Sequence, residues 1–240
     1  MNRQRLFVLI LCTLAFLGAS WYVFGRVWQE SHTRFRVGLP VPKSILPEDL
    51  LTPAERAAGT PPTMPDVRQT DELISGSTSS HVTLMVFGDF QSDLSQQQAL
   101  AVSQALNVIG PGLIRTVWRD LPDAQSHSRA IAAATAARCA SDQGKFSQMY
   151  TLLMTETKTY DDMEFLQFAR RIGVDEQRFT ICMRDPANSY HIQQDMDDAA
   201  NHGVTNVPTL FINGDPNIGY LDSTALTAAL RGALKQAAAQ

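Results

Sequence analysis

Ser92 and Ser95 are the residues whose types and spacing come nearest to an active-site pair in this chain. They flank Asp93 and Leu94 at the point where a predicted helix begins. The N-terminus of a helix stabilises an anion and lowers the pKa of a thiol placed there. A serine hydroxyl gains too little from the same field to ionise near neutral pH, and it cannot form a disulfide. We therefore expect a helix cap and a polar first-turn residue here, and no catalytic residue.

A strand, a sharp turn and a helix must position these serines. Residues 82–87 are mostly β-branched or apolar, which is typical of a buried strand. Residues 88–91 break this pattern, and apolar residues then recur at helical spacing. Ser92 suits the N-cap because its hydroxyl can accept a free backbone N–H, and Asp93 suits the positive end of the helix dipole.

This arrangement resembles the active-site region of the DsbA-like branch of the thioredoxin superfamily. In that family an Asp-Phe-Gln-like turn leads into Cys-x-x-Cys at the helix start, whereas here hydroxyls stand at both sulfur positions. A second signature lies at residues 201–214, where a Gly-Val turn precedes a proline that opens a strand. The resemblance implies that the Val207–Pro208 bond is cis, faces the first site and borders a groove for extended peptide.

The resemblance covers about residues 80–240 and implies an α/β thioredoxin fold, a central mixed sheet flanked by helices. Residues 132–154 resemble the helices that the family inserts, and we expect this helical insertion at about 124–203. The remaining expected elements are a strand at 113–118, helices at about 125–142, 144–156, 161–172, 175–184 and 187–202, strands at 209–212 and 218–220, and a helix capped by Ser223 that ends near 238.

Residues 1–26 are predicted to be a membrane anchor. Within them, residues 6–24 carry no charge over 19 positions, and as a helix they would span about 28 Å, close to the hydrocarbon thickness of a bilayer. A signal peptide cleaved after Ser20 is the alternative, because small residues precede that point. The short basic N-terminus and the family resemblance favour a single-pass protein of the bacterial inner membrane, with the C-terminal domain on the periplasmic or extracellular side.

Residues 27–79 are predicted to be a proline-rich connector of extended, semi-rigid chain. A capping box around Pro53 predicts one short helix near 53–58 within it. The net charge of −4 and the lack of a run of Lys or Arg exclude the footprint of a nucleic-acid-binding protein.

Cys139 and Cys182 both fall in the helical insertion, away from the positions where the family attacks its substrates. In an exported domain they can form a structural disulfide that closes a loop of about 44 residues and stabilises the fold by about 4 kcal/mol. Two buried thiols that pack as small apolar residues are the alternative.

The remaining candidates for chemistry are histidines and carboxylates. His127, His191 and His202 show no metal-ligand spacing, so we expect solvated helix surface and no metal site. The acidic residues Asp195, Asp197 and Asp198 are expected on an exposed helix face. Asp89 is expected to stabilise the turn before Ser92.

These observations favour a protein-interaction domain over an enzyme. We expect an accessory or scaffold subunit with protein partners in or at the membrane, a bilayer contact through residues 6–24, and no cofactor. Two enzymatic alternatives remain: a thiol–disulfide oxidoreductase, and a glutathione-dependent enzyme. The second rests on resemblance to kappa-class glutathione transferases, DsbA-like folds in which a serine at the position of Ser92 stabilises a glutathione thiolate. Whether the two serines are natural or replace cysteines stays open at this stage.

Overall fold

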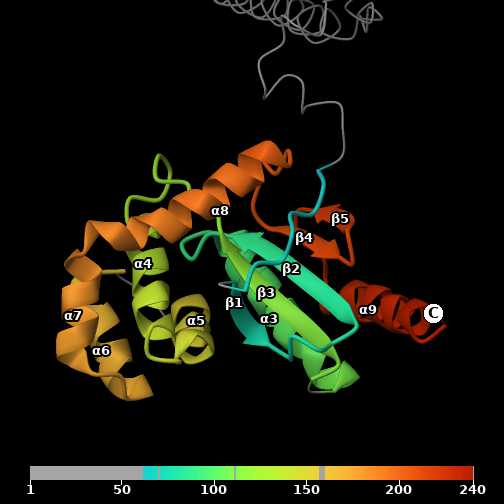
Figure 1. Ribbon diagram of the computed structural model, residues 1–240, viewed down its shortest axis with the longest axis horizontal. Helices are drawn as coiled ribbons and strands as arrows, with labels where there is room; N and C mark the ends of the chain where they lie inside the picture. The colour runs from blue at the N-terminus through green and yellow to red at the C-terminus, as the bar shows by residue number, and fades with distance from the viewer. Residues whose placement is uncertain (1–61, 70, 111, 157–159, 240) are drawn as a thin grey trace, which may run out of the picture. The chain divides into compact units, whose positions relative to one another are not determined.

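The computed structural model describes residues 62–239, apart from 70, 111 and 157–159. Its centre is a five-stranded mixed sheet with the order β1-β3-β2-β4-β5 (Figure 1). The strands are β1 (Glu72–Ser75), β2 (Val82–Gly88), β3 (Ile114–Asp120), β4 (Thr209–Ile212) and β5 (Asp215–Ile218). Two helices run beside the sheet, α3 (Asp93–Ile109) and α9 (Ser223–Ala237).

The continuous apolar run at residues 82–87 reflects the position of β2 at the centre of the sheet. This strand is buried along its whole length and pairs with β3 on one side and β4 on the other. A strand buried on both faces needs a continuous apolar run, and parallel strands need a crossover, which α3 supplies. The predicted strand, turn and helix are therefore confirmed in this order.

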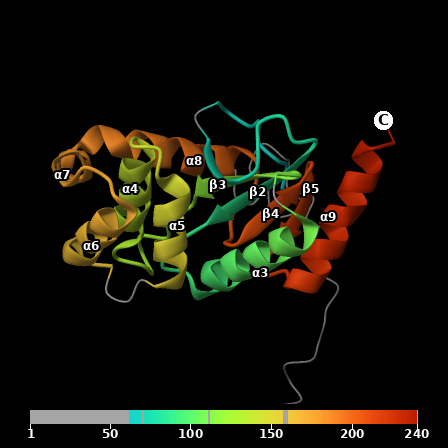
Figure 2. The same cartoon turned by 90° about the horizontal axis from the view of Figure 1, so that it is seen from below.

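Five helices are inserted between β3 and β4 and form a subdomain at one end of the sheet (Figure 2). They are α4 (Ala130–Ser141), α5 (Phe146–Thr155), α6 (Asp162–Ile172), α7 (Glu176–Arg184) and α8 (Ser189–Asn201), with a 3-10 turn, η2 (Pro186–Asn188), before the last. A disulfide between Cys139 and Cys182 links α4 to α7. The architecture confirms the predicted thioredoxin fold with a helical insertion.

The two faces of the sheet are covered differently. One face packs against α3, α9 and α5, with Trp118 among its largest buried side chains. On the other face, Met85, Phe87 and Phe211 form a second apolar cluster with Ala199 of α8. The segment 62–71 also lies on this face, where its Met64 and Val67 pack against the cluster.

Several expected boundaries differ from the structure. The expected connector ran to residue 79, but residues 72–75 form β1 and pair antiparallel with β3. The helix expected from 125 begins at Ala130, because side-chain bonds to Asp123 hold the preceding residues in turns. Strand β5 ends at Ile218, where a strand was expected to begin. The cap of α9 is Asp222, whose carboxylate accepts two backbone N–H bonds, rather than Ser223.

The predictions for the N-terminal part lie outside the described residues. These are the membrane span at 6–24, the cleavage point after Ser20 and the short helix near 53–58. In the part of the chain that the structure describes, none of the helices has the length and apolar character needed to cross a bilayer.

Candidate functional site

The two serines of the degenerate motif are held in a helix cap. Ser92 is the N-cap of α3, and its Oγ accepts a hydrogen bond from the Ser95 backbone N–H at 3.3 Å. The Oγ of Ser95 in turn accepts from the Asp89 backbone N–H at 3.2 Å. Both residues are buried, at 8% and 2% exposure. Each hydroxyl oxygen is therefore engaged with the backbone of its own turn.

Asp89 stabilises this turn, as expected, and also ties it to the helical subdomain. One carboxylate oxygen accepts from the Gln91 backbone N–H at 2.7 Å. The other accepts from the Asp123 backbone N–H at 2.9 Å and lies 2.7 Å from Nδ1 of His127. The expectation of a solvated helix surface for His127 is wrong, because its side chain is only 30% exposed and lies in the loop before α4.

Tyr160 is a site residue that the sequence reasoning missed. Its hydroxyl donates to the Phe90 backbone carbonyl at 2.6 Å, and the side-chain amide of Gln96 donates to the same carbonyl at 2.9 Å. Burial, together with the charge of Asp89, raises the pKa of Tyr160 to about 12, so the hydroxyl remains a donor at neutral pH. Because 70 residues separate Tyr160 from Phe90, no local pattern indicates this contact.

The second signature lies at the same end of the sheet as the first. The Val207–Pro208 bond is cis. Phe87 of β2 pairs with Thr209 of β4, so the proline loop and the turn before Ser92 emerge side by side. Val207 is half-buried, and Leu94, in the centre of the degenerate motif, is 47% exposed. Leu94 therefore presents exposed apolar area next to the buried cap of α3.

A thioredoxin family model matches residues 68–231. The chain belongs to the thioredoxin family. Among solved structures, it is similar to Wolbachia pipientis alpha-DsbA1, with 16% identity, a TM-score of 0.64, and coverage of 72% of this chain and 95% of that one. It is also similar to the thiol-disulfide exchange protein alpha-DsbA2 of the same organism, with 22% identity, a TM-score of 0.61, and coverage of 68% of this chain and 87% of that one. These likenesses show a DsbA-like thioredoxin fold.

Two curated relatives are named as Na(+)/H(+) antiporters NhaA 1. That of Salinispora arenicola is 34% identical over 160 residues, which is 67% of this chain and 24% of the relative. That of Mycobacterium sp. strain KMS is 26% identical over 231 residues, which is 95% of this chain and 34% of the relative. This thioredoxin-family chain therefore spans about a quarter to a third of the length of these relatives.

The described part of this thioredoxin-family chain has no cysteine at its site. Cys139 and Cys182 are bonded to one another in the helical subdomain. The third cysteine, Cys12, lies outside the described residues. Within residues 62–239, except for the five positions left out, we find no group of His, Cys, Asp and Glu side chains that could hold a metal ion.

The acidic residues of α8 correct another expectation. Asp195 is fully buried, and it was expected on an exposed helix face. It pairs with Arg68 of the N-terminal segment, with Arg119 of β3, and with Arg138 of α4 at 2.5 Å. Burial, together with nearby Asp120, raises the pKa of Asp195 to about 6.

Further carboxylates complete this buried ion network. Arg119, fully buried, pairs with Asp71 at 2.8 Å and with Asp198 at 2.6 Å, and Arg138 pairs with Glu72 at 3.1 Å. The network joins the segment 62–75 to β3, α4 and α8. It also includes Asp120 of β3, which pairs with Arg138 and lies opposite Gly88, the residue before the turn that leads to the serines.

Proposed function

We propose that this thioredoxin-family domain is a non-catalytic protein-binding domain that holds extended polypeptide beside Ser92 and Val207–Pro208. We further propose that residues 6–24 tether it to a bacterial inner membrane, with the domain outside the cytoplasm, as an accessory or scaffold subunit of a membrane complex. The observation that carries the proposal is the pair of serines at the redox positions, with both hydroxyl oxygens engaged in the cap of α3.

With serine at positions 92 and 95, the site lacks the groups that thiol–disulfide exchange requires. Thiol–disulfide exchange needs a thiolate that attacks a sulfur and a second thiol that resolves the mixed disulfide. Serine supplies neither step. The described cysteines, Cys139 and Cys182, join α4 to α7, and neither stands at the start of α3, where the family carries its attacking thiol.

The hydrogen bonds that hold the turn before Ser92 support the proposal that a binding surface is retained. Asp89, within the turn, accepts the Asp123 backbone N–H from the start of the insertion, and Tyr160, just before α6, donates to the Phe90 carbonyl, so the turn is held from two places although no thiol remains to be positioned. Leu94 stays half-exposed next to the buried cap. A pre-formed surface lowers the entropic cost of binding a flexible chain.

Ion exchange is not proposed, although the curated relatives are named antiporters. Those names describe whole proteins, and this chain matches only 24% of one and 34% of the other.

A photo-crosslinking experiment tests the binding surface. A photoreactive phenylalanine analogue replaces Leu94 in the full chain, expressed in its native membrane, and crosslinked products are identified by mass spectrometry. Leu113 is the matched control, because it is equally exposed, at 50% against 47%, and precedes β3 at the opposite end of that strand from the site. We expect a defined protein product at Leu94 and none at Leu113. Equal labelling at both positions, or none at Leu94, would contradict the proposal.

An activity assay separates this proposal from the enzymatic alternatives. Insulin reduction is measured for the full chain and for the Ser92→Cys/Ser95→Cys variant, and glutathione binding is measured by calorimetry. We expect insulin reduction only by the double-cysteine variant, and no glutathione binding by the unmodified chain. Insulin reduction by the unmodified chain would favour an oxidoreductase, and glutathione binding that Ser92→Ala abolishes would favour a transferase.

A further inference from the structure

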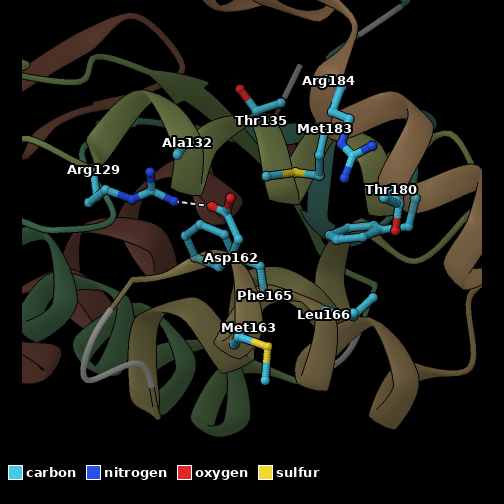
Figure 3. Close-up of a pocket in the computed structure, with 11 residues that line it drawn as sticks. Arg129, Ala132, Thr135, Asp162, Met163, Phe165, Leu166, Thr180, Met183 and Arg184 are labelled. Carbon is cyan, nitrogen blue, oxygen red and sulfur yellow. Dashed lines mark hydrogen bonds and ion pairs between the residues drawn. The ribbon is translucent and has the colours of Figure 1, made fainter.

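A cavity of about 370 Å³ lies in the helical subdomain, between α4, α6 and α7 (Figure 3). It is distinct from the surface beside Ser92, because none of the residues of that surface lines it. Its volume falls at the lower end of the range for small-molecule sites. Most of the lining residues are apolar: Ala132, Met163, Phe165, Leu166, Phe179 and Met183.

The hydroxyl groups of the lining are already used by their own helices. Thr135 Oγ1 donates to the Ile131 carbonyl at 2.8 Å, and Thr180 Oγ1 donates to the Glu176 carbonyl at 2.7 Å. Neither hydroxyl hydrogen is free for a ligand in this arrangement. A ligand would therefore gain affinity here mainly by burying apolar area.

The charges around the cavity do not balance. Arg129 pairs with Asp162 across the cavity wall, and its Nε also donates to the Tyr160 carbonyl at 2.8 Å. Arg184, at the end of α7, lines the other side of the cavity (Figure 3). Among the described residues, we find no ion pair or side-chain hydrogen bond of Arg184. The lining therefore carries one positive charge without a counter-charge.

We propose that this cavity binds a small monoanion with an apolar body, such as an aryl-alkyl or medium-chain carboxylate. The apolar body fills the space between the three helices, and the carboxylate meets the Arg184 guanidinium, whose planar fork matches it with two N–H donors. The site is independent of the function proposed for the surface beside Ser92.

Calorimetric titration with 4-phenylbutyrate tests the proposal. The full chain is held in lipid nanodiscs, with empty nanodiscs as the reference. We expect saturable binding at one site per chain, and binding of 4-phenylbutanol at least tenfold weaker because it lacks the charge. Absence of binding at millimolar concentration, or equal affinity for the alcohol, would overturn the proposal.

Three variants locate the site. Arg184→Gln should weaken binding about tenfold, in line with the loss of a charged hydrogen bond. Arg178→Gln is the control, because it removes an exposed arginine of the same helix that does not line the cavity, and its affinity should stay within twofold. Ala132→Leu should abolish binding by filling the space. If Arg184→Gln and Arg178→Gln bind 4-phenylbutyrate with equal affinity, the Arg184 charge has no role in binding. This test does not depend on whether Ala132→Leu folds.

Discussion

Replacement of Arg119 by methionine is expected to be among the most destabilising single changes in this domain. The Arg119 guanidinium is fully buried and has two close carboxylate partners, Asp71 at 2.8 Å and Asp198 at 2.6 Å. It also donates to the Asp66 backbone carbonyl at 2.7 Å. Methionine approximates the length of the side chain but satisfies none of these groups.

The size of this destabilisation depends on the carboxylates that lose Arg119 as a partner. The network contains three arginines, Arg68, Arg119 and Arg138, and five carboxylates, those of Asp71, Glu72, Asp120, Asp195 and Asp198. The variant would therefore hold two arginines against five carboxylates. Asp198 is 32% exposed and can be hydrated, whereas Asp71 is 1% exposed and keeps only Arg68. Loss of one partner of a buried ion pair typically costs about 3–5 kcal/mol. Because domain stabilities are about 5–15 kcal/mol, the change would remove at least about a fifth of the free energy of unfolding.

Urea unfolding, monitored by circular dichroism, measures the loss in the free energy of unfolding. Hydrogen exchange shows which segments open more readily in the variant. We expect faster exchange in residues 62–75, because Arg119 ties this segment to β3. Arg170→Met is the control, since its pair with Glu176 is half-exposed on both sides and should contribute less than about 1 kcal/mol. If Arg119→Met costs no more than Arg170→Met, the network does not hold the segment.

Three further changes test other parts of the structure. The raised pKa of Asp195 means that the folded state binds a proton more tightly than the unfolded chain, so the stability gained from this proton is full below about pH 4 and is lost as the pH rises through about 6. In urea unfolding, the free energy of unfolding of the unmodified chain minus that of Asp195→Asn should therefore increase as the pH falls from 7 to 4.5. A difference that does not change with pH would contradict the raised pKa. Cys139→Ser/Cys182→Ser should cost about 4 kcal/mol from loop entropy, in line with the separation of 43 residues, measured against the oxidised protein. Gly88→Ala would place a Cβ 2.2 Å from the Trp118 ring and should cost about 1–3 kcal/mol in thermal unfolding, whereas Gly232→Ala, with open space around it, should be neutral or stabilising.

Features with a local cause were predictable from the sequence. The continuous apolar run of β2 and the cap at Ser92 depend on neighbouring residues, and both were found where expected. The inserted helices were placed to within a few residues because helical periodicity is also local. The positions of Val207 and Pro208 came from resemblance, since no physical property of the sequence specifies a cis bond.

Features that depend on distant partners were not predictable. Asp195 was assigned to an exposed face because its neighbours along α8 are polar. Its burial depends on Arg138, 57 residues away, and on Arg68, 127 residues away. His127 was misassigned in the same way, because its partner Asp89 lies 38 residues earlier. Such contacts appear only when the topology brings β3, α4 and α8 together.

The position of β1 at the border of the sheet has a practical consequence for recombinant work. A shortened protein that starts at residue 80 would match the boundary suggested by sequence resemblance, yet it would lack β1. The N–H and C=O groups along that side of β3 would then face water and could template strand pairing with other copies, a known route to aggregation. Soluble versions of this domain should therefore begin before Pro62, so that β1 and its arginine and aspartate anchors are retained.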